Sequence, residues 1–252
     1  MRRSILLVLL CVAAAASCAK KQTVAPPARE RVGQTITHRV TAGETWESLA
    51  RDYYGNPTRA GELAADNGGE LARPPVEGSA VRVLLTDREL QYVRNRLDAA
   101  REYNAGLDLV ASGNYAEAAG RFESAVDLNP YFADASFNLA VAYQKLGYHA
   151  KAIDILDELV ALSPRNVEYL YALGVSRFAG ADYSAAKKAW GDALAIDPEH
   201  RKAVFSLGVL CEKTGKKDEA RSRFEQYLRL DPNGEWADAA RSHLEALGRP
   251  RR

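Results

Sequence analysis

Four short stretches decide the fold: Leu128-Asn129-Pro130, Leu162-Ser163-Pro164, Ile196-Asp197-Pro198 and Leu230-Asp231-Pro232. Their prolines stand 34 residues apart. Proline cannot continue an α-helix, and it disfavours helical geometry in the residue before it. Each stretch therefore marks the end of a helix, and the constant spacing predicts four equal helical units over residues 99–234.

Small and large residues recur at fixed offsets in these units, which span 99–132, 133–166, 167–200 and 201–234. The eighth position is small: Gly106, Ala140, Gly174 and Gly208. The twentieth is always alanine: Ala118, Ala152, Ala186 and Ala220. The twenty-fourth is large: Phe122, Leu156, Trp190 and Phe224. A closely packed helix pair needs small residues against large ones.

This pattern resembles the tetratricopeptide repeat, whose signature is a 34-residue period that closes on proline. The resemblance implies a mainly α fold, an α-solenoid of helical hairpins. Three or more stacked units bury a continuous core, and four are present. Residues 235–247 continue with helical spacing and predict a capping helix that shields the last repeat. Residues 248–252 are expected to form a disordered tail.

In this family the first helix of each repeat lines a concave groove. Here its fifth and ninth positions form an aromatic and an aliphatic row: Tyr103, Phe137, Tyr171, Phe205 and Leu107, Val141, Val175, Val209. The resemblance implies an apolar groove suited to an amphipathic helix or an extended apolar segment of a protein partner. Family members that grip a carboxylate use Lys and Asn, and that set is missing here. The alternative interpretation is that the aromatic residues pack between helices and leave the groove shallow.

The segment 36–85 has a different pattern. Residues 36–40 and 80–84 alternate between apolar and polar residues and predict two strands. Thr45 is placed as the N-cap of a helix that follows a turn, and a second short helix is expected over 58–65. The predicted order is strand, helix, helix, strand.

This unit resembles the LysM domain, a βααβ module that binds glycans containing N-acetylglucosamine. The likeness lies in His38-Arg39-Val40, Gly43 to Ala50, Tyr54-Gly55, Asn67, Gly78 and Val81-Arg82-Val83. The loop 68–77 departs from the family pattern in length and in its prolines. The resemblance implies peptidoglycan as a ligand and sugar contacts from two loops, which map onto Gly43, Glu44, Thr45, Asn67, Leu71 and Val76. The alternative is that these are only turn and cap residues.

Thr86 and Glu89 form a capping-box pattern, in which a hydroxyl and a carboxylate satisfy the first backbone N–H groups of a helix. No helix breaker follows before Ala111. Residues 86–98 therefore predict a connecting helix that runs into the first repeat and joins the two parts.

The first residues form a separate segment. Two arginines precede an apolar run over 5–16 that is too short to span a bilayer, so residues 1–17 predict a signal peptide. Ala15-Ala16-Ser17-Cys18 resembles the lipobox of bacterial lipoproteins, which implies cleavage before Cys18 and a lipid anchor in the membrane. In that family an Asp directly after the cysteine retains the protein in the inner membrane; here the residue is Ala19, so the resemblance implies the periplasmic face of the outer membrane. The alternative is a plain secretory signal and a soluble periplasmic protein. Residues 18–35 are predicted to form a flexible linker.

The composition excludes several classes of function. The 252 residues carry 34 basic and 33 acidic side chains, which leaves no electrostatic footprint of a nucleic-acid binder. No metal or cofactor is expected, because the four histidines stand at no ligand spacing. Ser184 and Lys187 match an SxxK motif, but at a repeat's helix start and without the partner motifs of that enzyme class. The protein is therefore not expected to be an enzyme.

The sequence thus predicts a non-catalytic cell-envelope adaptor that binds peptidoglycan through residues 36–85 and a protein through the groove. One alternative is an accessory lipoprotein of pilus, secretion or outer-membrane assembly, in which the LysM-like unit is only a spacer. Another is an accessory that brings a wall hydrolase to its glycan.

Overall fold

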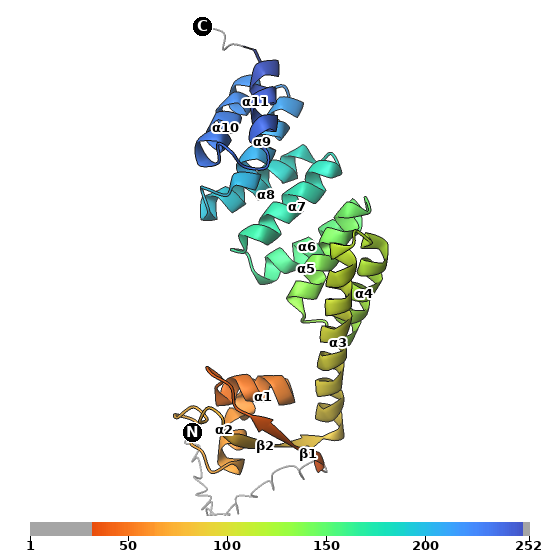
Figure 1. The fold of residues 1–252 in the computed structure, drawn as a ribbon, viewed down its shortest axis with the longest axis vertical. Coiled ribbons are helices and arrows are strands. Elements are labelled where there is room, and N and C mark those ends of the chain that lie inside the picture. The colour runs from red at the N-terminus through yellow and green to blue at the C-terminus, as the bar shows by residue number, and fades with distance from the viewer. Residues whose placement is uncertain (1–31, 249–252) are drawn as a thin grey trace, which may run out of the picture.

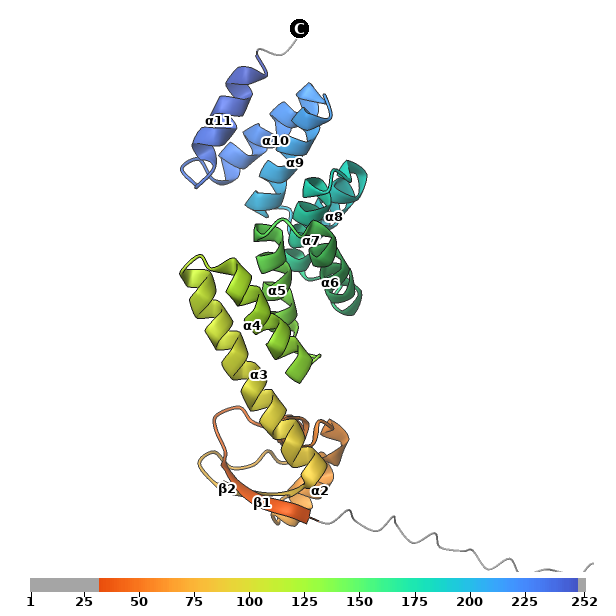
Figure 2. The same ribbon diagram turned by 90° about the vertical axis from the view of Figure 1, so that its right-hand side faces the viewer.

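The computed structural model describes residues 32–248. The predicted signal peptide, the lipidation site Cys18, the linker up to residue 31 and the tail after 248 lie outside the described residues. The described chain is elongated (Figures 1 and 2). A small N-terminal unit lies at one end, a long helix leads away from it, and a curved array of helices follows.

The N-terminal unit contains two strands and two short helices. Its elements are β1 (Val32–Arg39), α1 (Trp46–Tyr54), a 3₁₀ turn (Pro57–Arg59), α2 (Ala60–Asp66) and β2 (Ala80–Thr86). The strands pair antiparallel, with Ile36 opposite Val83. β1 begins four residues before the predicted strand, so the end of the predicted linker 18–35 belongs to the sheet. The reason is that β2 extends to Thr86 and offers backbone partners to these added residues.

The core of this unit is closed by a helix outside it. Trp46, Leu49 and Leu63 are buried together with the inward side chains of β2. Leu90 and Val93 of α3 (Asp87–Ala111) pack against this cluster. The long helix is therefore part of the hydrophobic core of the N-terminal unit as well as the first helix of the repeats.

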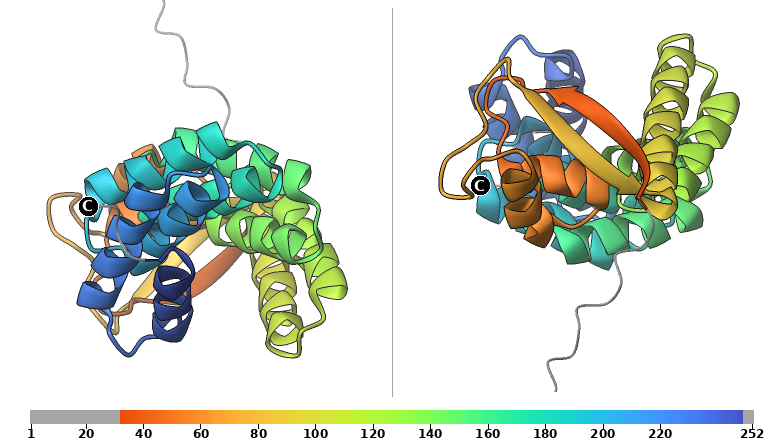
Figure 3. Two further views of the ribbon diagram at one scale, coloured as in Figure 1. Left: turned by 90° about the horizontal axis from the view of Figure 1, so that it is seen from above. Right: turned by 90° about the horizontal axis from the view of Figure 1, so that it is seen from below.

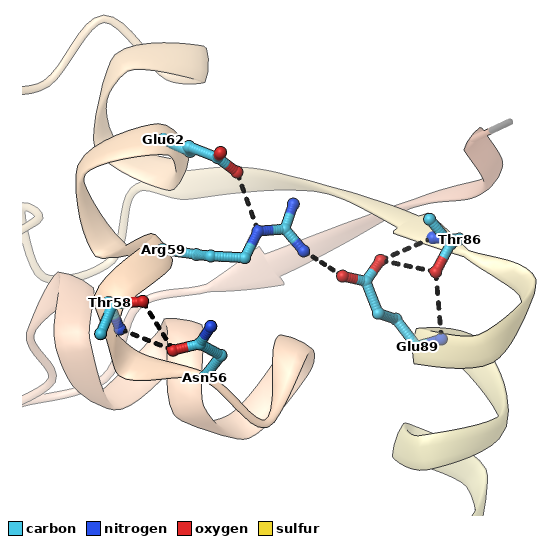
Figure 4. A network of polar contacts seen from close by, with 6 residues as sticks. All are labelled: Asn56, Thr58, Arg59, Glu62, Thr86 and Glu89. Atoms are coloured by element: carbon cyan, nitrogen blue, oxygen red, sulfur yellow. Dashed lines mark hydrogen bonds and ion pairs between the residues drawn. The ribbon is translucent and has the colours of Figure 1, made fainter. Parts of the chain in front are cut away.

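Polar contacts fasten the start of α3 to the unit (Figure 4). The predicted capping box is present: the hydroxyl of Thr86 accepts from the backbone N–H of Glu89, and the Glu89 carboxylate accepts from the backbone N–H of Thr86. Arg59 reaches from the 3₁₀ turn to the carboxylates of Glu62, at 2.8 Å, and Glu89. Further along α3, Arg96 pairs with Asp52 at 2.9 Å.

The four predicted hairpins are present. They pair α3 with α4 (Tyr115–Leu128), α5 (Ala133–Lys145) with α6 (His149–Leu162), α7 (Val167–Ala179) with α8 (Tyr183–Ile196), and α9 (Arg201–Lys213) with α10 (Lys217–Leu230). The second helix of each pair ends two residues before its repeat's proline. Figure 3, viewed along the long axis, shows the hairpins following a curve.

Small residues on first helices face large residues on second helices, as the spacing predicts. A Cβ added to Gly106 would lie 2.5 Å from the ring of Phe122, and one added to Gly208 would lie 2.7 Å from Phe224. Both rings are fully buried. Glycine is needed at these positions because the ring occupies the space of a side chain.

The predicted capping helix is α11 (Ala237–Ala246). Ala237 and Ala240 are buried against the last hairpin, and His243 stacks on Phe224 with ring centroids 4.7 Å apart. The end of the core is thereby covered. Within residues 32–248, no helix combines the length and the apolar character that a membrane span requires.

Candidate functional site

The predicted groove residues behave differently in the two halves of the array. In the first half, Tyr103 packs against Phe132 with centroids 4.9 Å apart, and its hydroxyl accepts from the Asn138 amide at 3.1 Å. Phe137 packs against Tyr169 at 5.2 Å. These aromatic residues fill the space between neighbouring helices, as in the alternative interpretation of the aromatic row.

In the first half, the aliphatic row does not take part in the apolar hollow that the second half of the array forms, described next. Leu107 is exposed on α3, and Val141 is half-buried on α5. Neither of them lines that hollow.

In the second half, four predicted groove residues converge on one hollow of about 280 Å³. We call it the apolar hollow. The predicted residues around it are Tyr171, Val175, Phe205 and Val209. Its remaining lining residues are Phe178, Ala179, Trp190, Ser206 and Trp236. Only Ser206 and the tyrosine hydroxyl contribute side-chain oxygen atoms, so the hollow suits an apolar group.

Neighbouring elements hold the walls of the apolar hollow in place. The indole N–H of Trp190 donates to the backbone carbonyl of Tyr171 at 3.0 Å. Phe205 packs against Trp236 with centroids 5.0 Å apart. The backbone N–H of Trp236 donates to the hydroxyl of Tyr227 at 3.2 Å. Such fixed aromatic walls lower the entropy lost when a ligand binds.

Sequence reasoning missed one wall of the hollow. It placed Trp236 in the capping helix and gave it no part in the groove. In the structure this residue precedes α11 and completes the hollow from the end of the array. A large aromatic residue just after the last repeat was the available signal.

A second hollow, of about 420 Å³, adjoins the first and shares Trp236 with it. Its lining includes His200 and is charged, with five carboxylates and two cationic side chains: Glu168, Asp197, Glu199, Asp231 and Glu235, with Arg201 and Lys202. We call this lining the acidic rim. Arg201 pairs with Asp231 at 3.0 Å. Four of the five carboxylates lie outside the first helices, in the turns that follow α8 and α10, and Glu168 lies in α7.

The acidic rim acts on the apolar hollow electrostatically. Burial raises the pKa of the Tyr171 phenol, and the carboxylates of Glu168 and Glu235 raise it further. A negative charge disfavours ionisation of a neighbouring phenol. Two carboxylates of the rim thus contribute, after burial, to the raised pKa of a residue that lines the apolar hollow.

The first loop of the N-terminal unit holds three predicted glycan contacts. Gly43 has a φ of +82°, which the turn requires and which favours glycine. The Glu44 carboxylate accepts from the ring Nε2 of His38 at 2.8 Å and from the backbone N–H of Thr41. The hydroxyl of Thr45 caps α1 through the backbone N–H of Ser48 at 3.1 Å.

Asn67 has an internal role. Its amide nitrogen donates to the backbone carbonyls of Leu63 and Arg82, each at 2.9 Å. Its amide oxygen accepts from the backbone N–H of Arg82 at 2.7 Å. The side chain thus joins the end of α2 to β2.

The second loop forms a hollow of about 390 Å³, and two predicted contacts, Asn67 and Val76, are in its lining. Val76 is 73% exposed, and the other predicted contact of this loop, Leu71, is 50% exposed. The buried indole of Trp46 also lines the hollow and donates to the Arg73 carbonyl at 2.8 Å. Gly43, Glu44 and Thr45 lie outside this lining, although backbone bonds between Val40 and residues 78–79 join the two loops.

The two residues of the SxxK motif lie at the exposed surface of α8. Ser184 is exposed at the start of α8, and Lys187 pairs with Glu219 at 3.3 Å. No group of three or more possible metal ligands occurs in residues 32–248. The chemistry that the described surface does present is that of a docking face: fixed apolar walls beside a charged rim.

Comparison with known proteins identifies the helical array. The profile of the family described as the tetratricopeptide repeat matches residues 103–167 and 171–235. Among solved structures, the chain is similar to a thermophilic tetratricopeptide repeat protein of Thermus thermophilus. The identity is 25% and the TM-score is 0.51, over 59% of this chain and 80% of that one. It has the same fold as pilF of Pseudomonas aeruginosa, with 23% identity and a TM-score of 0.53 over 61% and 69% of the two chains.

Curated relatives match parts of this chain and differ from it in size. The general transcriptional corepressor ssn6 of Schizosaccharomyces pombe is 28% identical over 182 residues, which is 71% of this chain and 16% of the corepressor. The photosystem I assembly protein Ycf3 of Acaryochloris marina is 28% identical over 45% of this chain and 66% of its own length. The chain thus spans a small part of the first relative and less than two thirds of the second.

Proposed function

The chain belongs to the tetratricopeptide repeat family, and on that premise we propose that it is a non-catalytic adaptor that docks a protein segment in the groove of its third and fourth repeats. The apolar hollow carries this proposal. Its walls are aromatic and aliphatic, fixed by neighbouring side chains, and open to solvent. Exposed apolar surfaces of this kind mark interaction sites, because covering them removes apolar area from water.

A photo-crosslinking experiment tests the docking face. A crosslinking amino acid at Ser206 is expected to capture a protein in intact cells, and Val175→Glu is expected to abolish that capture. Leu107→Glu is the matched control, because it sits at the same repeat position but outside the apolar hollow. Equal capture by all three forms would contradict the assignment of the groove.

We further propose that the adaptor works in the cell envelope, anchored through Cys18 at the periplasmic face of the outer membrane, and that its N-terminal unit binds peptidoglycan. The LysM-like motif residues and the hollow beside Val76 support the second part. Joining a wall ligand and a protein ligand on one chain raises the effective concentration of each near the other. Two weak attachments can then hold the complex firmly.

Sedimentation with purified peptidoglycan tests the wall attachment. The protein is expected to sediment with the wall, and Val76→Asp is expected to weaken this binding. Val167→Asp on α7 is a control for added charge away from the N-terminal unit.

Labelling with a radioactive fatty acid tests the lipid anchor, and loss of the label in Cys18→Ser is the expected result. An unlabelled protein in the soluble periplasm would contradict the anchor.

A specific observation favours a second candidate, an accessory of envelope assembly in which the N-terminal unit is a spacer. Glu44, Thr45 and Asn67 are all engaged in hydrogen bonds inside the unit. The sedimentation experiment separates the two candidates. Protein capture through the groove without any wall binding would favour the spacer.

A further inference from the structure

The apolar hollow and the acidic rim share an edge, so one bound segment can touch both. Trp236 lines both hollows. Tyr171 lines the apolar hollow and packs against His200 of the rim with centroids 5.2 Å apart. A side chain in the apolar hollow therefore lies next to residues of the rim, and its neighbours along the segment face carboxylates.

The carboxylates at this edge are accessible. The Glu168 side chain is 59% exposed, and its contact is the ring Nε2 of His200 at 3.4 Å. Glu199 and Glu235 are also exposed. The rim contains two cationic side chains, and Arg201 already pairs with Asp231. The edge therefore keeps a surplus of negative charge available to a ligand.

Resting on the proposed function, we propose that the occupant of the groove is a segment of another protein in which an apolar side chain is flanked by lysine or arginine. The apolar side chain fills the apolar hollow, and the flanking cation sits beside Glu168 and Glu235. Charge complementarity fixes the orientation of the segment and raises the rate at which it associates with the groove.

The same arrangement excludes other segments. An acidic segment would bring like charges together at the rim, and this repulsion acts against binding. An uncharged apolar segment would fill the hollow without the help of the carboxylates.

Three short fluorescent peptides test the inference by fluorescence anisotropy. In the first, leucines alternate with lysines, and in the other two the lysines are replaced by glutamines or by glutamates. The full protein is expected to bind the lysine peptide most tightly and the glutamate peptide most weakly. Raised salt is expected to reduce this difference, because salt screens exposed charges.

Charge variants locate the binding. Glu168→Gln and Glu235→Gln are each expected to weaken the lysine peptide about fivefold, the upper range for an exposed ion pair, and to leave the glutamine peptide unchanged. Glu225→Gln, which removes an exposed charge on α10 outside both linings, is the matched control. The isosteric change Val175→Thr is expected to weaken all peptides that bind.

The outcomes separate this inference from the function on which it rests. Equal binding of the three peptides, tighter binding of the glutamate peptide, or no effect of the two Glu→Gln changes would overturn it. If the Ser206 crosslinker still captures a protein in that case, the docking function stands and only the charge preference is wrong. The oligomeric state of the protein without peptide is measured by analytical ultracentrifugation. If Glu168→Gln or Glu235→Gln alters it, the face joins two copies of the chain and the inference is also overturned.

Discussion

The indole ring of Trp190 occupies the space that a side chain at Gly174 would need. A Cβ added to Gly174 would lie 2.3 Å from the indole Nε1. The tryptophan is buried, and its N–H donates to the backbone of the same first helix at Tyr171. The glycine therefore sets how closely α7 and α8 approach at the wall of the apolar hollow.

We predict that Gly174→Ala destabilises the protein by about 1–3 kcal/mol, because overpacking displaces a ring that cannot move freely. Gly191→Ala is the matched control in α8, where an added Cβ meets no atom within 4 Å. That change is expected to stabilise by about 0.5–1 kcal/mol, since alanine favours a helix interior. Urea unfolding curves of both variants test the pair. Equal effects would mean that the close approach is not important for stability.

The phenol of Tyr143 is predicted to titrate far above its ordinary pH. Burial, followed by a hydrogen bond to the Glu123 carboxylate, raises its pKa from 10.0 to about 12. The unfolded chain ionises at the lower pH, so the stability from this group is complete below pH 10 and is lost as pH rises towards 12. Ultraviolet titration of the protein against Tyr143→Phe measures the step. Glu123→Gln is expected to lower the pKa.

Glu44 is predicted to stabilise the N-terminal unit more at neutral pH than in acid. Partial burial works against the charged form, but hydrogen bonds from His38 and from the backbone of Thr41 outweigh it and lower the pKa of Glu44. The stability from this group is present above pH 4.5 and is lost as pH falls through the lowered pKa. Glu44→Gln is therefore expected to destabilise the protein at about pH 7, and this effect is expected to shrink as the pH falls from 4.5 through the lowered pKa. A pH-independent loss would indicate a packing role instead.

Cys211 is predicted to react slowly with thiol reagents in the folded protein. The residue is 2% exposed, and burial followed by the negative charge of Glu219 raises its pKa. Thiolate is the reactive form, so both effects slow modification. In a form with serine at positions 11 and 18, Cys211 is the only thiol, and a colorimetric reagent should react quickly only after urea is added. Fast reaction without urea would show that this hairpin opens.

The repeats could be predicted because their signals are local and periodic. Proline ends each second helix, and the glycine at position 174 implies a large partner one helix away, which Trp190 supplies. The start of β1 could not be predicted, because Gln34 and Thr35 become strand only through pairing with β2. The Arg59–Glu89 contact also depends on the fold, since 30 residues separate its members in the chain.

The groove residues could be predicted as a row but not as a cavity. The same aromatic position serves for packing at Tyr103 and for the wall of a hollow at Tyr171, because the surrounding second-helix and turn residues differ. Trp236 and the turn carboxylates lie outside the repeat positions used for prediction. Asn67 lines the hollow beside Val76, but nothing local in the sequence indicates that the backbone of β2 also engages its amide.

The long helix α3 sets the distance between the N-terminal unit and the repeats. Its 25 residues span about 37 Å at 1.5 Å per residue. It is embedded in the core of the N-terminal unit at one end and in the first hairpin at the other. One residue inserted in the stretch between them would turn everything beyond it by about 100° around the helix axis. The number of residues in this one helix thus sets both the distance and the rotational orientation of the docking face relative to the ligand of the N-terminal unit.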